Sequence, residues 1–556
     1  MKKLLAFLFI LFCGGAQSAQ IANVEYIHNA IKQKWDITVP YNSELSNPRV
    51  AANMKYLLTA IDVANEILNK SKTTDYSSSE FASMHAADTT ATDAAVDRLI
   101  LKNTDYKLKL THYYQREGYS GDIRDPNHLI MISAAGTYNI NWGDGTKEVI
   151  KKNTVGEQWF GHDYASDGYY TVRIGGQATK YSDDPDLSTV ILGTSYGCLD
   201  EWGWGGKCPL GITDINGCLG CVFPTLEDGS QPRFIDTFAE AYELDIDIPS
   251  GLFSGIHGAP VENMFKRTFS YASITSIPSD LFAGIQGPLA TGVFDATFAF
   301  TYIESIPEDL FAGILGPPID SMFENTFSGT GITSIPSGLF AGIQGPPAEN
   351  MFTSTFAANF GLESIPEDLF AGIQGPPAEN MFTGTFGNTA ITSIPSGLFA
   401  GIQGPPAEDM FTSTFAVNFM LESIPEDLFA GIQGPPAKNM FTETFVGNYM
   451  LQSIPEDLFA GIQGPPVVGM FYGTFESNEA LASIPENLFA GIDTTAPYAS
   501  AMFANTFAYC YNLTGPSARI NGQYLYNIWP NVNSYINTYS ECNGLDDWDS
   551  IPDNWK

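Results

Sequence analysis

Residues 351–380 read MFTSTFAANFGLESIPEDLFAGIQGPPAEN, and close copies of this stretch recur along the C-terminal half of the chain. Its Ile-Pro dipeptide returns nine times, with a spacing of 29 or 30 residues each time. A period in this range is typical of solenoids, in which one unit cannot bury its apolar face alone and stacks on its neighbours. The repeats therefore predict a continuous stack of coils over residues 232–515. The recurring prolines are Pro249, Pro278, Pro307, Pro336, Pro366, Pro395, Pro425, Pro455 and Pro485.

Each unit carries three phenylalanines at fixed offsets. Identical offsets in every coil are what core stacking requires, so we expect buried aromatic columns that run along the whole stack. The alternative is that these rings form an exposed stripe that binds sugars. Two successive sets are Phe352, Phe356 and Phe370, followed by Phe382, Phe386 and Phe399.

The order of residues within one unit predicts an α/β coil. Leu362 and Ile365 mark a very short strand. Ser364-Ile-Pro-Glu367 is a capping-box pattern, which predicts a short helix through Leu369 and Phe370. A glycine and the Gly-Pro-Pro segment that follow would end this helix.

The run from Thr385-Phe386 through Ala390, which stands at a Leu-equivalent position, to Ser393-Ile-Pro395 resembles the BspA-type leucine-rich repeat of bacterial surface proteins. The resemblance covers roughly residues 186–556. The sequence departs from that family in its extra Gly-Pro-Pro segment and in its use of Phe where many such repeats have Leu. The resemblance implies surface display and binding to other cells or matrix, and no chemistry.

Residues 103–185 change to a period of two, which is typical of an all-β sandwich. Trp142-Gly-Asp-Gly-Thr146, His162-Asp-Tyr164 and Tyr170-Thr-Val172 resemble the polycystic-kidney-disease (PKD) domain family. The resemblance implies an immunoglobulin-like spacer or adhesion module without catalysis. Asp144 could bind calcium, but a turn aspartate more often bonds its own backbone, and we favour that interpretation. We expect His162 to be structural.

The N-terminus predicts export. Two lysines, a short apolar run and small residues before a cut after Ser18 form a secretory signal over residues 1–18. We expect no segment that spans a bilayer. Residues 19–102 predict a short helical region and linker, which serves either as a spacer or as a docking helix pair.

Six cysteines remain after the signal, and an even number in an exported chain favours disulfides. The hypothesis for the C-terminal end is a bond between Cys510 and Cys542 on neighbouring coils. Free buried thiols, or a zinc site built on the closely spaced pair at 218 and 221, are the alternatives. We expect a cysteine-containing N-terminal cap over 186–231 and a C-terminal cap over 516–556. The candidate disulfide cysteines are Cys198, Cys208, Cys218, Cys221, Cys510 and Cys542.

The net charge of −36 argues against nucleic acid and anionic lipid as partners, because both bind basic surfaces. Between residues 275 and 518 there are 24 acidic residues and one basic residue, Lys438. Acidic pairs follow several Ile-Pro dipeptides, where they suit a helix start and a solvated surface. A glycosidase pair and a weak cation-binding surface are the alternatives. The candidate residues for cation binding are Glu367, Asp368, Glu426 and Asp427.

Together these patterns predict a multidomain chain: a short α-helical region, a PKD-like sandwich and an α/β leucine-rich-repeat-like solenoid. Near-identical coils and only six histidines argue against an enzyme, and we expect no cofactor. The predicted role is an exported surface or secreted protein, in preference to a periplasmic one, that binds a protein or glycan on another cell or in matrix. A structural or self-assembling envelope protein is the alternative, and the sequence fixes no oligomeric state.

Overall fold

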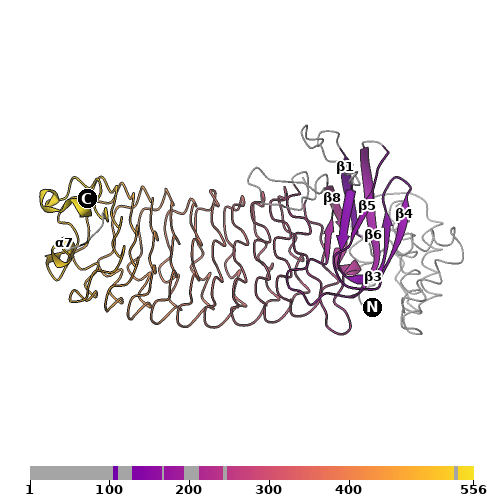
Figure 1. Cartoon of the computed structure of the whole chain (residues 1–556), viewed down its shortest axis with the longest axis horizontal. Coiled ribbons are helices and arrows are strands. Elements are labelled where there is room, and N and C mark those ends of the chain that lie inside the picture. Colours follow the sequence, from indigo (N-terminus) through magenta and orange to yellow (C-terminus); the bar gives the residue numbers. More distant parts are fainter. Residues whose placement is uncertain are drawn as a thin grey trace, which may run out of the picture. The chain divides into compact units, whose positions relative to one another are not determined.

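The computed structural model describes residues 104–110, 128–165, 168–192, 212–241, 247–530, 532 and 536–556. The predicted signal peptide and the predicted helical region of residues 19–102 lie outside these ranges. The described part begins with two antiparallel sheets, continues as a long stack of coils and ends in a small cap (Figure 1).

The sheets use strands from both sides of the predicted boundary at residue 185. The five-stranded sheet has the order β4-β3-β6-β1-β8, and the three-stranded sheet has the order β5-β2-β7. The predicted boundary is wrong, because β7 and β8 follow residue 185 and still pair with β2 and β1. The strands are β1 (Thr104–Leu110), β2 (His128–Ile132), β3 (Ala135–Asn141), β4 (Lys147–Lys152), β5 (Trp159–His162), β6 (Gly168–Lys180), β7 (Val190–Leu192) and β8 (Ile212–Gly217).

The turn between β3 and β4 holds the motif that suggested a PKD-like domain. The Trp142 amide donates to the Thr146 carbonyl over 2.9 Å, which closes the turn. Asp144 Oδ1 accepts a 2.8 Å bond from the Thr146 amide, so this aspartate bonds its own turn as predicted. Its other oxygen lies 2.7 Å from Nε2 of His162, whose ring stacks on Trp142.

The coils are joined by backbone hydrogen bonds even though they contain no regular strand. On one side of each coil, every second amide donates to a backbone carbonyl of the next coil. The Phe352 amide donates to the Met381 carbonyl over 3.1 Å, and the Ser354 amide donates to the Thr383 carbonyl over 2.8 Å. The amides between them bond three residues back within their own coil, as Thr355 does to Phe352. All these amide donors are therefore satisfied, as buried backbone requires.

The predicted α/β fold class is wrong. In the segment after each Ile-Pro, only three-residue turn bonds form, such as Leu369 to Pro366 and Ile373 to Phe370. Nearby, residues with positive φ recur every four positions, at Asn350, Ser354 and Ala358. Such left-handed residues interrupt a right-handed helix, so the chain makes successive turns instead. Helices in the described residues are short: α6 (Leu219–Val222), α7 (Leu525–Ile528), and the 3-10 turns η4 (Trp548–Ser550) and η5 (Asp553–Trp555).

The phenylalanine columns are confirmed as the core. Equivalent rings of successive coils lie nearly parallel, with centroids 5.9 Å apart for Phe352 and Phe382 and 5.8 Å apart for Phe356 and Phe386. The third ring, as in Phe370, packs tilted against the first at 4.7 Å. All six phenylalanines named from the sequence are at most 2% exposed: Phe352, Phe356, Phe370, Phe382, Phe386 and Phe399.

Both ends of the stack are covered. At the start, strand β7 replaces a preceding coil: the Thr189 amide donates to Arg233 over 2.7 Å, and Thr237 Oγ1 donates to the Val190 carbonyl over 2.8 Å. At the other end, one aromatic column continues from Phe507 through Tyr539 to the buried Trp555. A two-stranded ribbon of β9 (Arg519–Ile520) and β10 (Gln523–Tyr524) leads into α7 there (Figure 1).

Replacing Phe386 by Ala should destabilise the stack by about 3–5 kcal/mol, because it opens a cavity between three packed rings. The matched control is Phe360→Ala, since Phe360 is 73% exposed and should cost less than about 0.5 kcal/mol. Denaturant unfolding of the full chain measures both variants. Equal effects of the two substitutions would contradict the buried ladder.

Candidate functional site

From Thr301 onward, a column of buried polar side chains runs along one edge of the stack, three residues after a core ring of each coil. In four coils the residue is an asparagine that joins two coils. Asn448 Nδ2, for example, donates to the carbonyls of Phe415 and Phe445 at 3.0 and 2.9 Å, and its Oδ1 accepts the amide of Asn418 at 2.7 Å. Threonine or cysteine replaces asparagine in other coils. The buried polar column comprises Thr301, Thr330, Asn359, Thr389, Asn418, Asn448, Asn478, Cys510 and Cys542.

A second buried polar row bonds each coil to the one before it. Thr385 Oγ1 donates to the Phe352 carbonyl over 2.9 Å, and Thr414 Oγ1 makes the same bond to Phe382. Side chains of both rows thus donate hydrogen bonds to backbone carbonyls inside the core, which can accept bonds beyond those of the turns. Each interior position therefore requires a particular type of side chain, whereas the residue type at exterior positions of each coil is free to vary.

The side chains on either side of the buried polar column are exposed and largely aromatic. They follow the second core phenylalanine of their coil by two to five residues, so successive coils bring them to the same edge. The largest exposed fractions belong to Phe360, at 73%, and Tyr302, at 67%. We name this set the aromatic edge: Tyr271, Phe300, Tyr302, Phe360, Phe419, Met420, Tyr449, Met450, Tyr509 and Tyr511.

Rings of neighbouring coils contact each other on this edge. Tyr271 and Phe300 stack with centroids 4.6 Å apart and planes within 12°, and Phe419 and Tyr449 stack at 5.4 Å and 11°. Partial burial, together with the carboxylate of Glu240, raises the pKa of Tyr271 above its usual value. The rings are thus held in place while their outer faces stay in solvent.

Three glutamates follow rings of the aromatic edge closely in the sequence. Glu304 follows Tyr302 by two residues, and Glu363 and Glu422 follow Phe360 and Phe419 by three. All three glutamates are exposed. Lys438, the one basic residue between 275 and 518, belongs to a different column, where it pairs with Glu408. The aromatic edge therefore combines apolar rings with negative charge.

The carboxylates proposed from sequence for weak cation binding lie on another face, beside the turns that follow Ile-Pro. The Ser337 hydroxyl donates to the Asp368 carboxylate, with its oxygen 2.9 and 2.8 Å from the two carboxylate oxygens, and Ser396 donates to Asp427 in the same way. Glu367 and Glu426 are their exposed sequence neighbours. Within the described ranges no group of three or more His, Cys, Asp or Glu side chains could hold a metal ion.

A surface hollow of about 730 Å³ adjoins this acidic row. It lies between two coils at the point where Gly397 replaces the aspartate of other units, and Glu367, Gln374 and Gln403 line it with small residues. Gln374 and Gln403 each donate to a carbonyl three residues back. Only one carboxylate borders the hollow, so the arrangement offers no acid–base pair.

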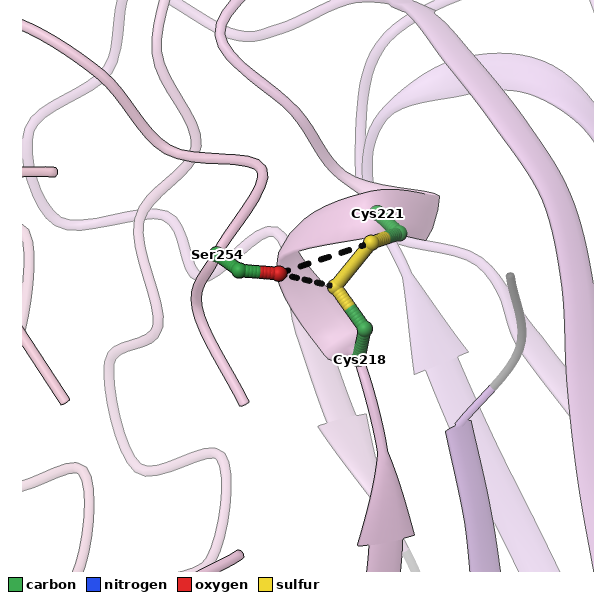
Figure 2. The surroundings of a disulfide bond; sticks show 3 residues. All are labelled: Cys218, Cys221 and Ser254. Carbon is green, nitrogen blue, oxygen red and sulfur yellow. Dashed lines mark hydrogen bonds between the residues drawn. A yellow bond between two sulfur atoms is a disulfide. The ribbon is translucent and has the colours of Figure 1, made fainter. Parts of the chain in front are cut away.

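Cys218 and Cys221 form a disulfide across α6, next to the first coil (Figure 2). Ser254 of the adjoining segment places its hydroxyl 3.1 Å from Cys218 Sγ and 3.8 Å from Cys221 Sγ. The hydroxyl is the donor, because a disulfide sulfur carries no hydrogen. This pairing confirms a disulfide for these two cysteines in place of the zinc alternative, whereas Cys198 and Cys208 lie outside the described residues.

The hypothesis of a disulfide between Cys510 and Cys542 is wrong. Both thiols are free and buried, and each takes the place of an asparagine in the buried polar column. Cys510 Sγ donates to the Phe475 carbonyl at 3.1 Å, and Cys542 Sγ donates to Phe507 at 2.9 Å. The two sulfurs thus bond to preceding coils and not to each other.

None of the helices in the described ranges has the length and apolar character needed to cross a membrane. Burial lowers the pKa of His128 to about 3, with a further contribution from His162, so His128 stays neutral at physiological pH. It packs edge-on against Trp142 as part of the sheet core.

Sequence reasoning located the core but missed the aromatic edge. The signal was present, because residues such as Phe360 and Phe419 occupy a position that is Ala390 or Gly331 in other units. A position that alternates between large aromatic and very small residues does not fill a close-packed core. It indicates a surface position, where side-chain volume is free to change.

Replacing Asn448 by Ala should cost about 2 kcal/mol or more, because the Phe415 carbonyl and the Asn418 amide lose their partner inside the core. Asn448→Thr is the matched control, since threonine occupies the same position at Thr330 and Thr389, and it should cost less. Equal losses of unfolding free energy in the two variants would show that the buried amide is dispensable.

Cys510 and Cys542 should resist alkylation in the native chain at pH 9, where an exposed cysteine is half ionised. Burial raises the pKa of Cys542 to about 12 and that of Cys510 well above its usual value, so the reactive thiolate is scarce below that pH. Mass spectrometry should find both thiols modified only after unfolding, and Cys218 linked to Cys221. Rapid native labelling of either buried thiol would refute the assignment.

Comparison of the chain with family models, with curated proteins and with solved structures finds no match. The resemblances to BspA-type repeats and to PKD domains therefore remain predictions from the residues. Functional proposals for this chain rest on its own geometry, above all on the aromatic edge.

Proposed function

We propose that the protein is an exported, non-enzymatic interaction protein, displayed on the cell surface or secreted, whose coils bind a protein or glycan on another cell or in matrix. The supporting observation is the aromatic edge. Ten of the twelve large apolar side chains that are exposed in the described coils belong to it; the other two are Leu315 and Val468. Concentrated exposed apolar surface marks an interaction site.

The core supports this role mechanically. Each coil is fixed to the next by backbone bonds, by a buried threonine and by stacked phenylalanines, as between Phe352 and Phe382. A surface that is already ordered loses little entropy when a partner binds. Repetition also lets one extended partner contact many coils weakly, as solenoid surfaces commonly do.

A structural or self-assembling envelope protein is the second candidate. Stacks that pack side by side would bring together two acidic surfaces of the 275–518 region, which carries 24 acidic residues and one basic residue. Repulsion between like charges opposes such packing. We therefore place adhesion to a foreign partner first.

Labelled full-length protein tests the proposal by its binding to cells and to immobilised matrix. We expect saturable binding that is lost when several whole coils are deleted, with circular dichroism to check that the shortened stack still folds. Protease treatment of intact producing cells should remove the coils, because a displayed protein is accessible.

Two results would contradict the proposal. Polymerisation of the purified protein without saturable binding to any cell or matrix preparation would favour the envelope role. Full protection from protease on intact cells, with digestion only after lysis, would place the protein behind a membrane.

A further inference from the structure

We propose that the aromatic edge binds an extended polypeptide segment rich in arginine and lysine; this inference rests on the proposed function and names the partner chemistry. Three properties of the edge carry it: exposed ring faces, interspersed carboxylates and the absence of basic residues from the edge itself. Each property is a feature of the described coils and none depends on the resemblance to other repeats.

The negative charge of the edge favours a positively charged partner. Tyr302, Phe360 and Phe419 each have an exposed glutamate two or three residues further along the same coil. At the C-terminal end of the edge, Glu479 and Glu541 occupy the positions that tyrosines hold in neighbouring coils, and both are exposed. A cationic segment would neutralise these carboxylates, whereas an anionic chain would be repelled.

The rings select among cationic groups. A guanidinium or ammonium over an aromatic face is attracted by the ring quadrupole, and guanidinium also stacks flat on the ring. Phe360 and Tyr302 keep most of their surface in solvent, so a ring face is open to such contact. Carboxylates beside the rings can accept bidentate hydrogen bonds from the same guanidinium.

A neutral glycan fits this edge less well. Sugars stack on aromatic rings, but a neutral chain laid over Glu363 and Glu422 would remove water from the carboxylates without supplying a compensating charge. The described basic groups near the start of the edge do not offer that compensation, because Lys266 and Arg267 already form ion pairs with Asp295 and Asp236. The observations therefore favour a cationic polypeptide.

The spacing of the coils suits an extended chain. Stacked rings of the edge lie 5.4 Å apart between Phe419 and Tyr449. Side chains on one face of an extended polypeptide recur about every 7 Å, and long arginine and lysine side chains can absorb the difference. Successive cationic side chains of one segment can thus reach successive coils.

An oligo-arginine peptide is the probe, measured by fluorescence anisotropy at physiological ionic strength against the full-length protein. The test variant carries Tyr302→Ala, Phe360→Ala and Phe419→Ala together, which leaves every charge in place. The control variant carries Leu315→Ala and Val468→Ala, which are exposed apolar residues away from the edge. We expect the test variant to bind about tenfold or more weakly, and the control to bind as the unaltered chain does.

The same variants in the cell-binding assay separate this inference from the proposed function. If the test variant binds oligo-arginine and cells as strongly as the unaltered chain, general surface charge explains the binding and the edge is not the site. Competition by a neutral oligosaccharide, with loss in the test variant, would make the edge a glycan site and overturn the inference. If the unaltered chain binds no cell or matrix at all, the proposed function itself fails.

Discussion

Hydrogen bonding between successive coils is the constraint on which the rest of the structure depends. Alternate amides such as Phe352 and Ser354 donate to the next coil, and one buried threonine per coil donates back to the coil before it. These bonds require every coil to follow the same path, so the phenylalanines fall into columns. A core of stacked rings then stabilises a chain that has almost no regular secondary structure.

The difference between interior and exterior positions explains how the coils can share one core and still carry a distinctive surface. The interior tolerates few residue types at each position, because a buried amide or hydroxyl must satisfy fixed carbonyls, as Asn448 does. Exterior positions on the same coil carry no such requirement. Aromatic residues and glutamates have accumulated on one edge, where variation leaves the stack intact.

Sequence reasoning identified the period, the buried phenylalanines and the turn role of Asp144, because these depend on spacing and on local chemistry. It could not identify the coil conformation, because Ser364-Ile-Pro-Glu367 matches a helix start, whereas the left-handed residues that prevent a helix become visible only in the backbone. The pairing of Cys510 with Cys542 failed for a related reason. Neighbouring positions on coils suggested a bond, but each thiol acts as an asparagine substitute within the core.

Amide hydrogen exchange of the full-length chain tests the central claim most directly. Residues 352–358 form neither helix nor strand, and such a segment would ordinarily exchange fast. Because its amides bond to the next coil or within their own turn, the account predicts slow exchange there, comparable with strands β3 and β6. Rapid exchange throughout the central coils, beside protected sheets, would show that the coils do not stack as described.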